Sequence, residues 1–183
     1  VAPLDFASFF RWYSTKRTPG FVMVHAEDPN RKAILKMLSE DQQLRFTPGA
    51  YFGNNLERHL RTSGYLHAGL TDYTFEVDEA GKAWWVVTVY DPTIVWSGEK
   101  VRGVAIVDPA SGETKFFPLG QVPEWVDRAI PAQFVKKYLD WYGDYRNGWL
   151  NSWFGRLNLI EPEEPSIIYA VDGQPDWVTG MTS

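Results

Sequence analysis

Hydrophobic and polar residues alternate with a period of two along several parts of the chain, and this pattern predicts β-strands. Strands are expected at Tyr73–Val77 and Ala83–Tyr90, joined by the turn sequence Asp-Glu-Ala-Gly. A second hairpin is expected from Val101–Val107 and Thr114–Pro118, because Asp108–Gly112 between them has the composition of a turn. Phe21–Ala26 is expected as a short buried strand, and Ser166–Ala170 with Trp177–Thr179 as a last hairpin.

Apolar residues three and four positions apart predict helices elsewhere in the chain. Asp28-Pro29 resembles an N-cap followed by proline at the first helical position, so a helix is expected at Asn30–Leu38. The segment Pro3–Tyr13 is rich in aromatic residues, and Phe6, Phe9, Phe10 and Tyr13 have the spacing of one helical face. Further helices are expected at Pro48–Arg61 and Pro131–Tyr142, with a helical turn at Pro123–Arg128. This mixture of elements predicts an α+β fold with antiparallel sheets and helices on one face.

An internal repeat is indicated by matches at one constant spacing. Gly103 and the strand after it follow Gly20 and its strand by 83 residues, and Pro131 follows Pro48 by the same distance. Each copy is expected to contain a strand, a connection, a helix and a hairpin. The predicted organisation is an N-terminal aromatic helix at 1–19, a first repeat at 20–100 and a second at 101–183, with an insertion at 143–165.

A strand containing Trp-Trp-Val, here Trp85-Val86 and its neighbours, and a strand that ends in Val107-Asp108 before Ser111-Gly112-Glu113 together resemble PepSY-type domains. The resemblance implies two cystatin-like repeats in tandem, as in the extracytoplasmic part of larger bacterial envelope proteins. It further implies a non-catalytic interaction module in the periplasm or on the cell surface, as part of a membrane-anchored protein. The start at Val1 is consistent with a piece of a longer chain.

Composition removes several other classes of function. The net charge is −5, and no stretch of the sequence is rich in Lys or Arg, which argues against nucleic acid or an anionic membrane as the partner. The chain has no cysteine, so disulfides, thiol nucleophiles and Cys-based metal sites are excluded. No apolar run is long enough to span a bilayer, so no direct membrane insertion is expected.

No assembled catalytic or metal site is visible in the sequence. His25, His59 and His67 have no metal-ligand spacing, and Ser97 and Ser111 lie in turn sequences without a nucleophile elbow. Two acidic clusters, at 76–79 and 161–164, are interpreted as a charged turn and a solvated linker. The chain is therefore expected not to be an enzyme and to need no cofactor, although a site shared between the repeats stays open.

Aromatic residues make up 16% of the chain, and they are dense near the predicted insertion. Aromatic rings beside Asn and Arg can anchor a protein partner or stack on a sugar. The alternative is that these rings fill the junction between the repeats. The leading hypothesis is a scaffold that binds a protein partner or neighbouring domains through sheet edges and this segment, and the second is a carbohydrate-recognition or glycan-processing domain. The candidate binding residues are Trp141, Tyr142, Tyr145, Arg146, Asn147, Trp149 and Trp153.

Overall fold

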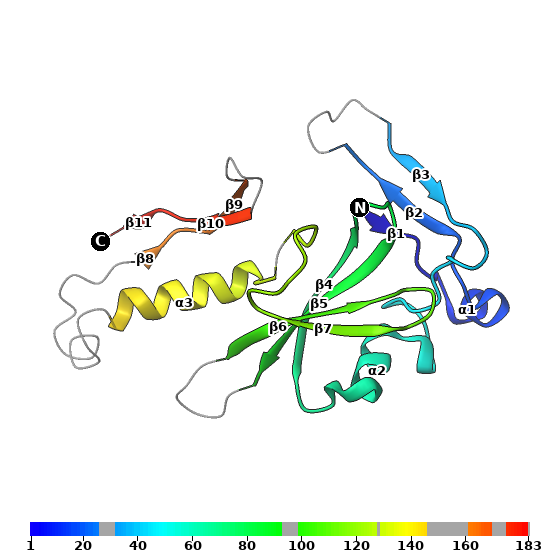
Figure 1. Cartoon of the computed structure of the whole chain (residues 1–183), viewed down its shortest axis with the longest axis horizontal. Helices are drawn as coiled ribbons and strands as arrows, with labels where there is room; N and C mark the ends of the chain where they lie inside the picture. The colour runs from blue at the N-terminus through cyan, green and yellow to red at the C-terminus, as the bar shows by residue number, and fades with distance from the viewer. Residues whose placement is uncertain (26–31, 93–98, 128, 146–160, 170–174, 183) are drawn as a thin grey trace. The chain divides into compact units, whose positions relative to one another are not determined.

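The computed structural model describes residues 1–25, 32–92, 99–127, 129–145, 161–169 and 175–182 (Figure 1). It divides into two compact units, Val1–Val126 and Asp127–Ser183. The first unit contains β1 (Ala2–Pro3), α1 (Phe9–Thr15), β2 (Gly20–Met23), β3 (Ile34–Met37), the 3-10 helix η1 (Phe52–Asn54), α2 (Leu56–Leu60), the π-helical turn η2 (Arg61–Tyr65), β4 (Gly69–Val77), β5 (Ala83–Asp91), β6 (Lys100–Val107) and β7 (Thr114–Pro118). The second contains α3 (Ala132–Tyr145), β8 (Glu161–Pro162), β9 (Ser166–Tyr169), β10 (Pro175–Val178) and β11 (Met181–Thr182). The predicted α+β class is confirmed.

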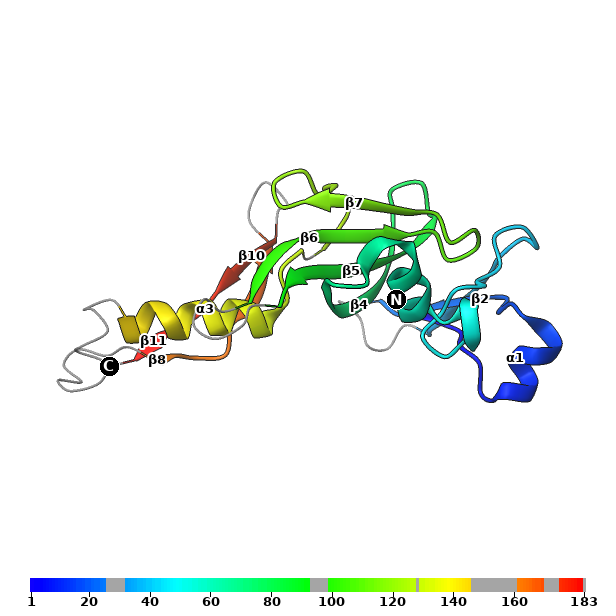
Figure 2. The ribbon, with the colours of Figure 1, turned by 90° about the horizontal axis from the view of Figure 1, so that it is seen from below.

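A four-stranded antiparallel sheet in the order β4-β5-β6-β7 forms the centre of the first unit (Figure 2). Its two outer hairpins are those predicted from the alternating pattern and the turn residues. The sheet forms because β5 and β6 are rich in Val, Ile and Trp, which suit a buried pleated surface. The predicted repeat boundary at 100/101 falls at the first residue of β6, so it assigns the paired neighbours β5 and β6 of this sheet to different repeats. The compact units therefore do not coincide with the predicted repeats.

One face of this sheet carries the main hydrophobic core. Trp85, Val87 and Val89 of β5 point to this face, and Leu56 and Leu60 of α2 pack against them. All five side chains are buried, and removing such side chains from water is the main stabilising contribution to folding. Phe21, Leu44, Phe46, Phe75, Ala105 and Val107 belong to the same cluster.

A three-stranded antiparallel sheet, in the order β1-β2-β3, lies at the N-terminal end of the chain. The helix predicted at Asn30–Leu38 is wrong, because Ile34–Met37 forms β3 and pairs with Met23–Gly20 of β2. Its apolar spacing fits a strand as well as a helix, and pairing with β2 decides between them. Gly20 allows β2 and β3 to approach each other closely, since a Cβ at this position would lie 2.0 Å from the Lys36 carbonyl oxygen. Residues 26–31, which include the predicted N-cap, lie outside the described part of the chain.

The helices predicted at Pro3–Tyr13 and Pro48–Arg61 are shorter in the structure than in the prediction. α1 begins at Phe9, because Ser8 Oγ accepts a hydrogen bond from the Arg11 amide and caps the helix. Its buried residue is Trp12, whereas Phe10 and Tyr13 from the predicted aromatic face are exposed. Residues 48–51 precede η1 as a loop, and α2 begins after Asn55, which caps it through its side chain.

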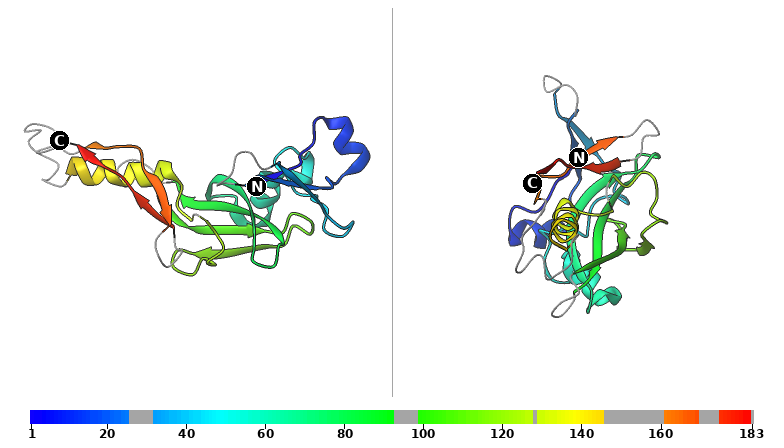
Figure 3. Two further views of the ribbon diagram at one scale, coloured as in Figure 1. Left: turned by 90° about the horizontal axis from the view of Figure 1, so that it is seen from above. Right: turned by 90° about the vertical axis from the view of Figure 1, so that its left-hand side faces the viewer.

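In the second unit, α3 confirms the helix predicted at Pro131–Tyr142, and β9 pairs with β10 as the predicted last hairpin. Figure 3 shows this hairpin running beside α3. The Trp177 indole Nε1–H donates to the Ile130 carbonyl oxygen at 3.0 Å, which ties β10 to the start of the helix. At the helical turn predicted for Pro123–Arg128, the structure has a single turn in which the Val126 amide donates to the Pro123 carbonyl at 3.1 Å. None of the helices in the described ranges has the length and apolarity needed to span a bilayer.

Candidate functional site

The binding residues predicted from the sequence fall partly inside the described chain. Trp141 is half-buried on α3, and the neighbouring Tyr142 is 57% exposed. The Trp141 ring packs against Tyr138 at 5.8 Å between centroids, with the Lys137 ammonium 5.6 Å from its centroid. Tyr145 is the last residue of α3. The other predicted residues, Arg146, Asn147, Trp149 and Trp153, lie outside the described ranges.

Two of the histidines and serines considered in the sequence, His59 and Ser111, have structural contacts. His59 Nε2 lies 2.7 Å from the Gly112 carbonyl oxygen, so this ring joins α2 to the turn after β6. The Ser111 hydroxyl accepts a hydrogen bond from the Glu113 amide inside the same turn. Within the described ranges, no group of three or more His, Asp or Glu side chains is placed to hold a metal ion.

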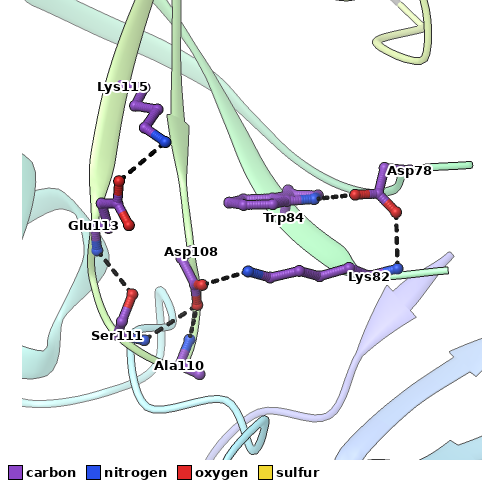
Figure 4. Close-up of polar contacts among 8 residues, drawn as sticks. All are labelled: Asp78, Lys82, Trp84, Asp108, Ala110, Ser111, Glu113 and Lys115. Atoms are coloured by element: carbon purple, nitrogen blue, oxygen red, sulfur yellow. Dashed lines mark hydrogen bonds and ion pairs between the residues drawn. The ribbon is translucent and has the colours of Figure 1, made fainter. Parts of the chain in front are cut away.

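Two turns of the four-stranded sheet form a polar network around Trp84 (Figure 4). Asp78 accepts hydrogen bonds from the Trp84 indole at 2.8 Å and from the Lys82 amide at 2.9 Å. The Lys82 ammonium lies 2.7 Å from Asp108 Oδ2 and 4.1 Å from the centre of the Trp84 ring. The turn Asp78–Lys82 is thereby joined to the turn that starts at Asp108.

Asp108 also organises its own turn and the segment beside it. Its Oδ1 accepts the amides of Ala110 and Ser111 at 2.8 and 3.1 Å. One residue further along, the Pro109 carbonyl accepts the amides of both Arg45 and Phe46. The turn between β6 and β7 is therefore fixed from within by a carboxylate and from outside by the chain before α2.

The pKa of Asp108 lies below its usual value. Burial by itself would raise this pKa, but the hydrogen bond and charge of Lys82 and the two turn amides outweigh burial. The pKa of Asp78 is lowered in the same way: burial would raise this pKa, but the hydrogen bonds from the Trp84 indole and from the Lys82 and Ala80 amides together outweigh burial. Both carboxyls are therefore ionised at neutral pH.

Acidification is expected to weaken the fold through Asp108. Its folded pKa is below the unfolded value of about 3.9, so its contribution is complete above that pH and is lost as pH falls through the folded pKa. We expect Asp108→Asn to lower the free energy of unfolding at pH 7 by roughly 1–3 kcal/mol, as charged hydrogen bonds are lost. Urea titrations from pH 7 to pH 2 should show a flatter pH dependence in the variant. An equal dependence in both proteins would show that Asp108 does not link protonation to folding.

A pocket of about 200 Å³ lies beside this network, within the first unit. Trp84 and Trp125 line it and stack, with ring centroids 6.3 Å apart and an interplanar angle of 29°. Ile106, Phe117 and Pro123 add apolar surface, and Asp78, Glu113 and Lys115 add charges. Such a pocket has room for one ring or one side chain of a ligand.

The outer edge of β3 is a second candidate surface. The Leu38 amide donates to the Pro19 carbonyl, and antiparallel pairing alternates, so Ile34 and Lys36 direct their backbone groups to β2. The amides and carbonyls of Leu35 and Met37 therefore point away from the sheet. The side chains of Ile34, Leu35 and Met37 are each more than half exposed. In the described part of the chain, β3 thus presents an open edge with apolar side chains.

A third candidate surface is an aromatic patch, which we define as Phe9, Phe10, Tyr13, Tyr51 and Phe52. The Phe9 ring contacts Tyr51 at 5.2 Å and Phe52 at 6.3 Å between centroids, which joins α1 to the loop before α2. Trp12 lies beneath the patch and packs 5.6 Å from both Tyr51 and Phe52. The sequence analysis placed the α1 rings on one helical face and did not identify them as a binding surface.

Phe52 has a backbone conformation that bulky residues rarely adopt. Its φ is 52°, in the left-handed region, and its side chain is 60% exposed. Such a conformation costs of order 1–3 kcal/mol and is concentrated at functional sites. The loop sequence Pro48-Gly49-Ala50 before it and Gly53 after it was the available signal for an irregular segment here.

Comparisons with known proteins found no match to this chain. No protein-family model, no curated protein and no solved structure matches it.

Proposed function

We propose that this chain is a non-catalytic interaction module that binds an extended segment of a protein partner, or of a neighbouring domain, by adding it as a strand to β3. The observation that carries the proposal is the open edge of β3. The outward amides and carbonyls of Leu35 and Met37 offer main-chain hydrogen bonds, and the exposed side chains offer apolar contacts. Main-chain pairing of this kind supplies affinity, and alternate side chains supply specificity.

An open apolar edge is normally avoided in soluble proteins. Natural edge strands are shortened, charged or covered, because unpaired backbone groups promote association with other chains. β3 has one charged residue, Lys36, whose ammonium donates to the Gly81 carbonyl at 3.2 Å. Its three other residues are apolar, which supports a partner as the reason for the exposure.

The proposed extracytoplasmic location rests on the resemblance to PepSY-type domains, and the proposed duplication has additional support. The elements follow in the order hairpin, helix, hairpin twice: β2-β3, α2, β4-β5, and then β6-β7, α3, β9-β10. Gly20 and Gly103, which are equivalent in the proposed repeat, also share one contact. A Cβ at either would lie 2.0 Å from a carbonyl oxygen of the neighbouring strand, that of Lys36 or Phe117.

Amide hydrogen exchange tests the strand-addition proposal. Peptides selected from a phage-displayed random library for binding to the full chain are expected to slow exchange at the Leu35 and Met37 amides. The Ile34 and Lys36 amides already face β2, so they should change little and act as an internal control. Replacing both Leu35 and Met37 by Lys should weaken peptide binding by roughly tenfold or more, since apolar contact is lost.

A matched variant, Leu66→Lys, removes an exposed leucine of the same unit outside β3 and should leave peptide binding unchanged. If bound peptides leave exchange at Leu35 and Met37 unaltered, the β3 edge is not the binding surface. The carbohydrate hypothesis attached to Trp141–Trp153 stays a prediction, because most of its residues lie outside the described chain.

A further inference from the structure

The aromatic patch has an exposure that packing inside the chain does not explain. Phe10 is 80% exposed and Tyr13 65%, and the patch includes the strained, exposed Phe52. Single exposed apolar side chains are common, whereas contiguous ones mark sites of interaction. Figure 2 shows that α1 lies away from the four-stranded sheet. The α1 part of the patch is therefore separate from the pocket at Trp84, which lies on that sheet.

Basic residues accompany the patch, although the chain as a whole is acidic. Residues 6–17 contain Arg11, Lys16 and Arg17 and no acidic residue, and residues 48–56 contain no charged residue. The Lys16 ammonium lies 3.4 Å from the centre of the Trp12 ring and 4.6 Å from that of Tyr13. Lys and Arg are not clustered along the sequence, but the helix places Lys16 beside the exposed ring of Tyr13.

We propose that the aromatic patch is a docking surface for the headgroup region of a bilayer that contains anionic lipid. Aromatic rings prefer the boundary between headgroups and acyl chains, because they combine an apolar body with a polarisable face. Lys and Arg beside them are attracted to anionic headgroups. The chain lies on the bilayer in this arrangement, with Phe10 and Phe52 entering the boundary, and no segment crosses it.

The charge of the patch distinguishes a bilayer from a second copy of the chain. A symmetric contact through this patch would bring Arg11 and Lys16 of both copies into one interface. Like charges placed across an interface oppose association, whereas anionic lipid neutralises them. Residues 48–56 next to these cations carry no charge, and the acidic side chain beside this segment, Asp5, accepts hydrogen bonds from the Thr47 hydroxyl and the Gly49 amide.

Flotation of the full chain with vesicles tests the proposal. We expect binding to vesicles of phosphatidylcholine with phosphatidylserine, and weaker binding to phosphatidylcholine alone. Phe10→Ser should reduce the partition coefficient by roughly tenfold, as burial of one aromatic ring is lost. Arg11→Glu should reduce binding to the anionic vesicles and leave binding to phosphatidylcholine unchanged, because its contribution is electrostatic.

Phe52→Asn separates binding from folding. Asparagine tolerates the left-handed backbone better than phenylalanine, so this variant should keep or raise the thermal midpoint of unfolding. Its partition coefficient for anionic vesicles should fall by roughly tenfold. The control Leu66→Ser removes an exposed leucine outside the patch and should bind as the original chain does. Failure to float with anionic vesicles would overturn the proposal. So would a dimer in sedimentation equilibrium that Phe10→Ser dissociates, since a second copy would then occupy the patch.

Discussion

Trp85→Ala is expected to lower the free energy of unfolding by about 3–5 kcal/mol, the range for removing a buried aromatic side chain. Trp85 is 3% exposed and belongs to the core between the sheet and α2. Its ring packs against Phe75 with centroids 5.0 Å apart. Its indole Nε1–H donates to the Phe46 carbonyl at 2.9 Å, and alanine would leave that buried oxygen without this partner.

Urea denaturation followed by far-ultraviolet circular dichroism measures this loss. Trp85→Phe separates its two causes, because phenylalanine keeps most of the packing and removes only the indole donor. We expect this variant to lose roughly 1–3 kcal/mol, which is less than the alanine variant loses. A loss below about 1 kcal/mol for Trp85→Ala would contradict the placement of this ring in the core.

Gly103→Ala is expected to disrupt the pairing of β6 with β7. A Cβ at position 103 would lie 2.0 Å from the Phe117 carbonyl oxygen and 2.8 Å from the Pro118 Cα, and both are backbone atoms. Backbone cannot rotate away as a flexible side chain can, so β7 must move. We expect a loss of at least about 1–3 kcal/mol, the usual range for inserting a methyl group into a packed site.

Gly53→Ala is the matched control for Gly103→Ala, because nothing lies within 4 Å of a Cβ at position 53. Amide exchange locates the effect: Gly103→Ala should accelerate exchange in β6 and β7 and leave α2 protected. Full protection of β7 in a variant as stable as the original chain would show that β7 lies further from Gly103 than the structure indicates.

The sheet hairpins were predictable because local signals agree with the fold. In β5 and β6, alternation and β-branched residues predict strands, and Asp108 with Gly112 predicts the turn that the structure contains. The stretch 34–37 was not predictable in the same way. Its apolar spacing fits either element, and pairing with β2 decides for the strand. Tertiary contacts override local preference most easily in short segments like this one.

The candidate surfaces were harder to predict from the sequence than the fold was. Sheet edges were expected to bind partners, yet β3 itself was assigned to a helix. The aromatic patch could not be predicted from spacing, because Phe9, Phe10 and Tyr13 have the spacing of one helical face, and such a face is often buried. The buried residue of α1 is Trp12, which packs against Tyr51 and Phe52 from a distant part of the chain. Sequence spacing alone does not contain that contact.

The anchoring of the turn between β6 and β7 has a practical consequence for protein engineering. Tight hairpin turns are common places to insert tags, fluorophores or loops, because they are usually free in solvent. Here the Pro109 carbonyl accepts hydrogen bonds from the amides of residues 45 and 46, and the Gly112 carbonyl is hydrogen-bonded to His59 Nε2. A label inserted between Asp108 and Gly112 would separate this hairpin from α2. Gly53, which has no neighbour within 4 Å of a Cβ and no left-handed backbone, is a better attachment point for a reporter group.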